Sequence, residues 1–308
     1  MPLMPAHRVH LCSAVLAMIL TIADSPARAQ SDIRMRIRES ADALTTAAAL
    51  SRLDPAQRVR TVEFIGGSAL FILTHELGHA VITEFNLPVL GRVEDAADSF
   101  AALALLHVGN EFTHEVLVNA ARNLLLIGEH KRSMGVPPVF YDEHGLDHQR
   151  AYMIVCLMVG SDQAAFSDLA ERAKLPPERQ ETCQLDYDQA KDSWLRLLRP
   201  HFRAEAQPSF WERLFFSRMR ALGKPPSPVA INYREAPGPL EPFREIARTL
   251  RLLEIVRDFA AKSFDFPRPL TIEAKTCGEP NAFWDPQERS VTLCYELLAS
   301  DAQVALSP

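Results

Sequence analysis

Two histidines four residues apart, His75 and His79, enclose Glu76 in the pentapeptide His-Glu-Leu-Gly-His. Residues with this spacing leave the same face of a helix about one turn apart, so both imidazoles can bind one small cation. Zinc binds imidazole nitrogen at about 2 Å, and a catalytic zinc keeps one of its four positions for water. Glu76 can take a proton from that zinc-bound water and then donate it to a leaving amine. The spacing therefore predicts one Zn2+ and a general base.

A catalytic site of this kind needs a third protein ligand, and we expect it to be Glu94. If the zinc helix ends just before residues 87–91, His79 lies about 10 Å back from that end, whereas the extended link spans about 16 Å. The chain can therefore fold back far enough. Asp98 follows one turn after Glu94 on the same face, where it can accept the second ring N–H of either histidine and fix its orientation.

The pentapeptide lies late in a long predicted helix. Asp54 followed by Pro55 is a favourable start, because aspartate caps helices and proline suits the first position. The apolar periodicity then continues to Phe85, where Asn-Leu-Pro stops it. The alternation of apolar and basic residues over Ile33–Ile37 predicts a half-buried strand. Further helices are predicted over 39–53, 92–108, 111–131, 147–159, 163–174 and 187–198.

The last third of the chain has a different pattern. Residues 200–242 contain eight prolines, which exclude a continuous helix and indicate an extended connection, with one strand over 229–233. A helix is predicted over 241–263, and two strands over 270–276 and 290–295 are expected to form a hairpin with a long loop. The pattern as a whole predicts an α+β fold that is mainly helical and has a small C-terminal sheet.

The zinc-helix residues carry a resemblance to known proteins. Residues 74–80 and 91–98 resemble the gluzincin arrangement of two histidines plus a glutamate with an aspartate four residues on. They resemble more closely a bacterial family of secreted zinc metallopeptidases that is classed as a domain of unknown function. That resemblance includes residues 142–150 and 277–283 and covers most of the chain. It implies a zinc-dependent hydrolase with a zincin-like fold over residues 30–308, with His75, His79 and Glu94 as ligands and Glu76 as the base.

The C-terminal hairpin is expected to lie beside the zinc helix. In many zinc peptidases a strand next to that helix pairs with extended substrate. Residues 281–286 and 290–298 resemble the segment that precedes the zinc helix in other gluzincins. We infer a permuted order, in which helical residues 39–199 and the connection 200–242 come first and residues 243–298 supply the strand. The alternative is an ordinary disulfide-closed hairpin.

Attack on a carbonyl builds negative charge on its oxygen, and a hydrogen-bond donor beside the zinc would stabilise that charge. His144, Arg150 and Tyr295 are the candidates for this catalytic role. Each has an ordinary alternative, since ionisable and aromatic residues mostly serve structure. His144 could be a loop residue, Arg150 an ion-pair partner and Tyr295 a core residue.

The first 29 residues have the pattern of a secretory signal peptide. Arg8 precedes a short apolar run, and Ala27 and Ala29 stand at the positions before the expected cleavage after Ala29. The mature protein is therefore expected to be exported, either periplasmic or secreted. No later segment of the sequence is apolar enough to predict a transmembrane span.

Four cysteines follow the predicted signal peptide, and an even number in an exported protein indicates disulfides. Three pairings are possible, of which the sequence-local one costs least in loop closure. A cysteine zinc site is disfavoured, because the sequence has no close Cys-x-x-Cys pair. The local pairing joins Cys156 to Cys183 and Cys277 to Cys294.

A formal net charge of −6 gives no reason to expect nucleic acid as a partner. The expected partner is a peptide or protein substrate, whose amide bond the zinc site would hydrolyse. Other amides or esters are not excluded by the motif, because the zinc chemistry is the same. A zinc-stabilised periplasmic binding or scaffold protein without turnover is the alternative, but such a protein has no use for Glu76.

Overall fold

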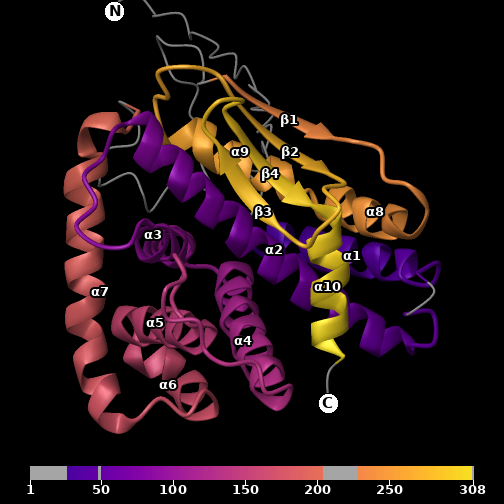
Figure 1. Ribbon diagram of the computed structural model, residues 1–308, viewed down its shortest axis with the longest axis horizontal. Coiled ribbons are helices and arrows are strands. Elements are labelled where there is room, and N and C mark those ends of the chain that lie inside the picture. Colours follow the sequence, from indigo (N-terminus) through magenta and orange to yellow (C-terminus); the bar gives the residue numbers. More distant parts are fainter. Residues whose placement is uncertain (1–25, 48–49, 204–227, 307–308) are drawn as a thin grey trace, which may run out of the picture.

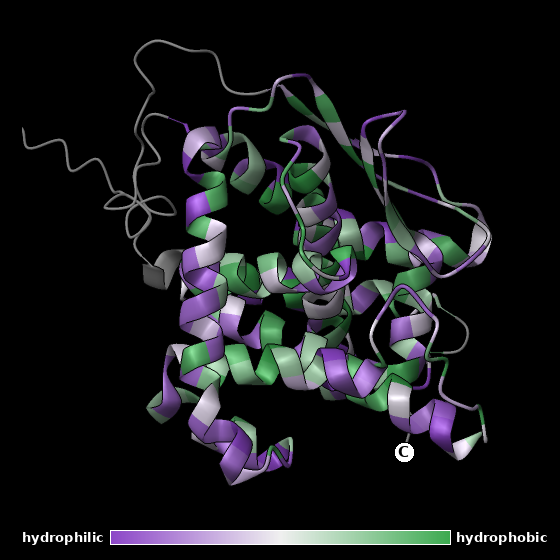
Figure 2. Ribbon diagram, turned by 60° about the vertical axis from the view of Figure 1, so that its left-hand side comes forward, coloured by the Kyte–Doolittle hydropathy of each residue, from purple (hydrophilic) through white to green (hydrophobic). Residues whose placement is uncertain are grey.

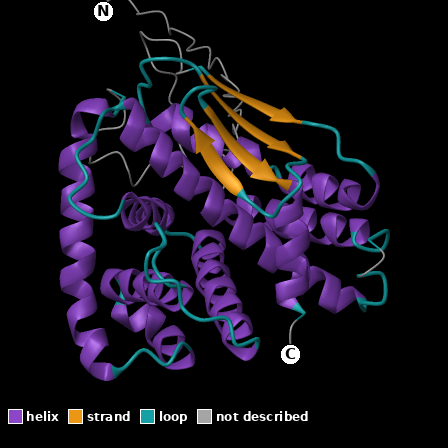
Figure 3. Ribbon diagram, in the orientation of Figure 1, coloured by secondary structure: helices purple, strands orange, loops and turns teal. Residues whose placement is uncertain are grey.

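A computed structural model describes residues 26–47, 50–203 and 228–306 of the chain. It is mainly helical, with one four-stranded sheet in the C-terminal part, so the expected α+β class is confirmed (Figure 1; Figure 3). The helices are α1 (Pro26–Ala43), α2 (Pro55–Glu84), α3 (Val93–Val108), α4 (Glu111–Ser133), α5 (Asp147–Ser161), α6 (Gln163–Arg172), α7 (Pro177–Leu198), α8 (Glu241–Leu250), α9 (Leu252–Ser263) and α10 (Tyr295–Ala305). The strands are β1 (Val229–Tyr233), β2 (Leu270–Lys275), β3 (Ala282–Asp285) and β4 (Ser290–Cys294).

Helix α2 is the central element of the fold. The Asp54 carboxylate accepts a hydrogen bond from the backbone N–H of Gln57, and the Gln57 side-chain oxygen accepts one from the backbone N–H of Asp54. The helix therefore begins with a complete capping box. It ends at Phe85, where Asn86 adopts a φ of 50° that continues no right-handed helix. One side of α2 packs against α3 and α4 and another against β3 and β4 (Figure 1).

Hydrophobic residues concentrate in the interior helices, whereas the peripheral helices carry more hydrophilic ones (Figure 2). Among the described residues, α2 is the one helix long and apolar enough to cross a membrane, and 89% of its most apolar window is buried inside the fold.

Helices α3 to α7 form the layer on one side of α2. Within it α5 packs tightly on α7, and the Cys156–Cys183 disulfide joins the two helices. Gly160 allows this approach, because a Cβ at that position would lie 2.1 Å from the Cys183 carbonyl oxygen. The predicted helices of this layer are present, although α7 begins ten residues earlier than expected, at Pro177.

The sheet has the strand order β1-β2-β4-β3. Strands β1, β2 and β4 run parallel, whereas β3 is antiparallel to β4 and forms an edge. The predicted hairpin between 270–276 and 290–295 is therefore wrong, since those strands lie side by side but parallel. The second arm of the hairpin is β3, which the sequence analysis assigned to a loop. The second disulfide, Cys277–Cys294, closes the loop that leads from β2 to β3.

Three other local predictions are wrong. Residues Ile33–Ile37 belong to α1 rather than to a strand, because their burial follows a helical period: Ile33, Arg36 and Ile37 are partly buried, whereas Arg34 is exposed. Arg36 bonds Asp32 one turn back and the Thr249 carbonyl of α8. The helix expected over 39–53 ends at Ala43. The single helix expected over 241–263 is two, since Arg251 has a φ of 58°.

The signal-peptide prediction lies almost entirely outside the described residues. Residues 1–25 are not among them, and the expected cleavage after Ala29 falls near the start of α1.

A buried polar contact joins α10 to α2 and α4. The Asn123 side-chain amide donates to Ser68 Oγ at 2.7 Å and to Asp301 Oδ1 at 3.0 Å. Burial raises the pKa of Asp301 to about 6, although its bonds to Ser68 and Asn123 act in the opposite direction. A protonated Asp301 therefore suits this interior better than a carboxylate does.

Replacement of Asp301 by asparagine is expected to stabilise the protein at pH 8 but not at pH 3.5. The folded state keeps the Asp301 proton up to about pH 6, whereas the unfolded chain loses it near the ordinary aspartate pKa of 3.8. The contribution of this residue to stability therefore falls as pH rises between those values, by up to ~3 kcal/mol. Urea unfolding of both proteins across this range checks it; a constant difference between them would contradict the assignment.

Candidate metal centre

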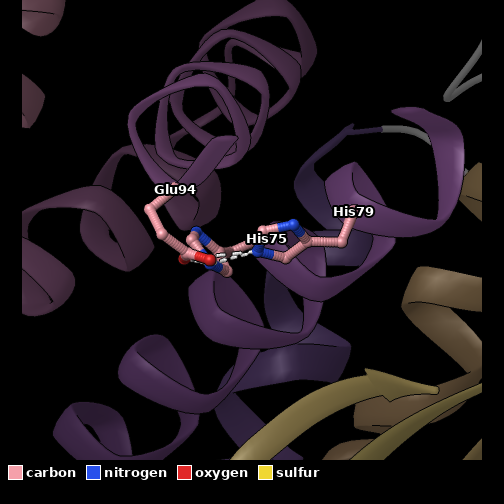
Figure 4. Close-up of side chains that lie close together, drawn as sticks. All are labelled: His75, His79 and Glu94. Carbon is pink, nitrogen blue, oxygen red and sulfur yellow. Dashed lines mark hydrogen bonds and ion pairs between the residues drawn. The ribbon is translucent and has the colours of Figure 1, made fainter. Parts of the chain in front are cut away.

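Three side chains from two helices converge beside the middle of the molecule. His75 and His79 extend from α2, and Glu94 reaches them from the first turn of α3 (Figure 4). The His75 Nε2 atom lies 3.1 Å from His79 Nε2 and 3.2 Å from Glu94 Oε2, which is 3.3 Å from His79 Nε2. Ligands about 2.0–2.1 Å from a tetrahedral zinc are about 3.3 Å apart, so the three separations fit one such ion.

Glycine permits the close approach of the two helices. A Cβ at Gly78 would lie 3.0 Å from the Phe100 ring and 3.3 Å from the Ala97 Cα, both on α3. A residue larger than glycine at position 78 would push α3, and with it Glu94, away from α2. Gly78 was not among the predicted site residues, although a glycine inside a buried helix is itself a signal of close packing.

The orientation of His75 is fixed by Asp98. Its Nδ1 lies 2.7 Å from Asp98 Oδ1, and since an ionised carboxylate only accepts hydrogen bonds, Nδ1 must carry the proton. In the neutral ring the lone pair of Nε2 then faces His79 and Glu94. This is the tautomer a metal ligand requires, and a carboxylate behind the ring is the usual means of selecting it.

The donor set also suits a cation electrostatically. Glu76, Glu94 and Asp98 are all buried. Among the described residues, the permanently charged cation that pairs with this group is Arg150, whose Nε and Nη2 donate to Asp98 at 2.7 and 2.8 Å. Buried carboxylates in excess of their cationic partners are costly. A divalent ion between the ligands would balance the charge, so the residues present fit the metal.

The pKa values of the cluster follow from these contacts. Burial would lower the pKa of His75, but its hydrogen bonds to Asp98 and Glu94 raise it to about 9. Burial would raise the pKa of Asp98, yet the Arg150 guanidinium and His75 hold it at about 2. Burial raises the pKa of Glu76 above its ordinary value. A cation that binds here therefore competes with a proton on His75.

Glu76 lies between the metal cluster and the edge of the sheet. Its carboxylate is 3.9 Å from His75 Nε2 and accepts a hydrogen bond from the backbone N–H of Trp284 in β3. The Cys294 N–H of β4 donates to the Asn281 carbonyl oxygen. Because residues along an antiparallel strand point their backbone N–H groups alternately toward and away from the partner strand, the Trp284 N–H points away from β4. The expected strand beside the zinc helix is thus present, and it is β3.

His144 is brought to the cluster by the loop between α4 and α5. Its Nε2 lies 2.9 Å from Glu94 Oε2, and its ring stacks on that of His75 with centroids 6.4 Å apart. Its backbone N–H donates to Asp142. The side chain is half exposed, so it also faces solvent. The hydrogen bond to Glu94 raises the pKa of His144.

The structure does not bring the other two oxyanion candidates to this position. Arg150 is the ion-pair partner of Asp98, which was its ordinary alternative. Tyr295 is fully buried at the start of α10, and its hydroxyl donates to the Arg234 carbonyl oxygen at 2.8 Å. Its catalytic assignment was wrong, because a hydroxyl enclosed in the core cannot reach a substrate.

Replacement of Arg150 by methionine is expected to destabilise the fold by about 3–5 kcal/mol, because it leaves the buried Asp98 carboxylate without its cation. Zinc affinity should also fall about 10–100-fold, since Asp98 then orients His75 less firmly. Urea unfolding and competition with a chromogenic chelator measure the two effects. The control is Arg248→Met, which removes an exposed ion pair with Glu245 and should change stability by less than about 0.5 kcal/mol. Equal effects would refute the positioning role.

Comparison with known proteins adds one finding. A family model (DUF4344) with the description "Putative metallopeptidase" matches residues 30–198 and 240–306. The match includes the three clustered side chains, Asp98, His144 and the edge strand β3. This chain matches no curated protein and no solved structure.

Proposed function

This chain belongs to the family described as "Putative metallopeptidase", and we propose that it is a zinc-dependent hydrolase that cleaves peptide bonds. The observation that carries the proposal is the convergence of His75, His79 and Glu94 with a buried carboxylate, Glu76, beside them. A structural zinc would need a fourth protein ligand and no base. Among the described residues, the group of potential ligands that lie close to one another contains three side chains, His75, His79 and Glu94.

In the proposed reaction Glu76 is the general base. A zinc ion at this position supplies a Lewis acid that lowers the pKa of water and polarises a carbonyl group. Glu76 accepts the proton of the attacking water and passes it to the leaving amine. Burial, which raises its pKa, favours both steps, since a base that must later act as an acid works best with a pKa near the operating pH.

His144 is the residue we propose for stabilising the developing negative charge on the substrate oxygen. It is half exposed, it lies beside Glu94, and as an imidazolium it can donate from either nitrogen. Strand β3 is proposed to bind the substrate backbone, because it is the edge strand of the sheet and lies beside Glu76. An extended peptide added at this edge would lie across the cluster.

The cysteines and the N-terminal sequence support a proposal for where in the cell the protein acts. Two disulfides indicate an oxidising environment. We further propose export through a signal peptide cleaved after Ala29, which leaves a periplasmic or secreted enzyme.

The test is metal content together with hydrolysis. The purified mature protein is expected to hold one zinc per chain by plasma mass spectrometry and to cleave fluorescently labelled casein. Treatment with 1,10-phenanthroline should abolish cleavage, and one equivalent of zinc should restore it. Cleavage that persists in the metal-free protein would exclude the proposed chemistry.

A further inference from the structure

Exposed apolar side chains gather on two segments next to the metal centre. The α2–α3 link (residues 85–92) separates the two histidines from Glu94, and the α4–α5 loop (residues 134–146) carries His144. Six of the ten large hydrophobic residues that are exposed in the described part of the chain lie on these two segments. They are Leu90, Met134, Val136, Val139, Phe140 and Tyr141. Isolated exposed hydrophobic residues are common, but such a concentration indicates a binding surface.

The α4–α5 loop is attached to the metal centre at one end. His144 contacts Glu94, and the next residue, Gly145, faces the guanidinium of Arg92 on the α2–α3 link, 3.3 Å from where its Cβ would lie. Phe140 and Tyr141, which are 82% and 93% exposed, precede His144 by only three to four residues. The loop therefore holds the backbone of Phe140 and Tyr141 within a few residues of the metal centre.

The same loop is built to hold its shape. Two consecutive prolines, 137 and 138, fix the backbone φ angles just before Val139 and Phe140. The Val136 N–H bonds the Lys131 carbonyl, and the His144 N–H bonds the Asp142 carboxylate. The fold gains nothing from aromatic rings in water, so a loop that presents them rigidly favours contact with another molecule.

Charge and backbone geometry identify that molecule. The α4–α5 loop contains Asp142 and Glu143 and no lysine or arginine, so the loop itself offers no cationic side chain to an anionic lipid surface. On the opposite side of Glu76, strand β3 is the edge of the sheet, and such an edge can pair with an extended polypeptide.

We propose that Phe140 and Tyr141 form the specificity surface of this site and bind large apolar side chains of an extended polypeptide next to the bond to be cleaved. This inference rests on the proposed function and deepens it by naming the substrate class. The α4–α5 loop binds the side chain, whereas β3 binds the backbone.

Peptide binding to the zinc-loaded Glu76→Gln protein tests the proposal without turnover. The probes are two end-blocked octapeptides of glycine and serine, one with a central phenylalanine–leucine pair and one with a central serine pair. The apolar peptide is expected to bind at least about tenfold more tightly. Adding Phe140→Ser and Tyr141→Ser should remove that preference while zinc content and melting temperature stay unchanged. The control is Leu185→Ser, which alters an exposed apolar residue on α7.

The outcomes separate this inference from the proposed function. A preference that survives the double substitution would overturn the inference, as would a loop that instead binds phosphatidylglycerol vesicles or a second copy of the chain. If the protein with Glu76 intact binds the apolar peptide through the loop but never cleaves it, the proposed function fails and the binding surface stands. If it cleaves both peptides equally, with or without the loop aromatics, the function stands and the surface fails.

Discussion

Replacement of Glu76 by glutamine is expected to lower peptide hydrolysis by about 10²–10⁴-fold while zinc stays bound. The two side chains have nearly the same shape, and glutamine can still accept the Trp284 N–H bond through its amide oxygen. It cannot take a proton from water. The measurement is turnover of labelled casein together with zinc content by mass spectrometry.

The control for this variant is Glu63→Gln, an exposed glutamate on the same helix. Glu63→Gln should leave both the turnover rate and the zinc content unchanged. The pair of variants also separates the enzyme from a zinc-stabilised scaffold protein, in which Glu76→Gln would change no measurable property. If the glutamine variant retained the full rate, another residue would have to be the base.

The metal cluster was accessible to sequence reasoning because most of its geometry is local. The spacing of His75 and His79 fixes their common helix face, and the short link to α3 limits where Glu94 can lie. The start and end of α2 were likewise predicted, since Asp54 and Asn86 act on neighbouring backbone groups. Periodicity and local capping chemistry were enough for these features.

The wrong predictions for the sheet and for Tyr295 concern contacts between residues that are far apart in the sequence. Nothing in the strand patterns of β2 and β4 distinguishes a parallel pair from a hairpin, because the choice depends on β3 taking the edge beside α2. His144 lies 50 positions after Glu94, and only the packing of the α4–α5 loop brings them together. Tyr295 follows a buried strand directly, a position that places it in the core.

Replacement of His79 by alanine is expected to remove the zinc. The variant keeps only two of the three ligands, so its affinity should fall by more than the 10–100-fold typical for loss of an outer hydrogen-bond partner. His79 is the suitable residue to change, since it is less buried than His75, which also bonds Asp98. Metal content after dialysis measures the effect.

Thermal unfolding distinguishes loss of zinc from loss of structure. Because a ligand that binds only the folded state stabilises it, by about 2.7 kcal/mol at a hundredfold excess over Kd, added zinc should raise the melting temperature of the wild type but not of His79→Ala. The control His130→Ala, at an exposed site near the end of α4, should respond as the wild type does. Without added zinc, the His79 variant and the metal-free wild type should melt at similar temperatures. A variant that still bound zinc tightly would show that the ion is held elsewhere, and Glu76 would then have no metal beside which to act.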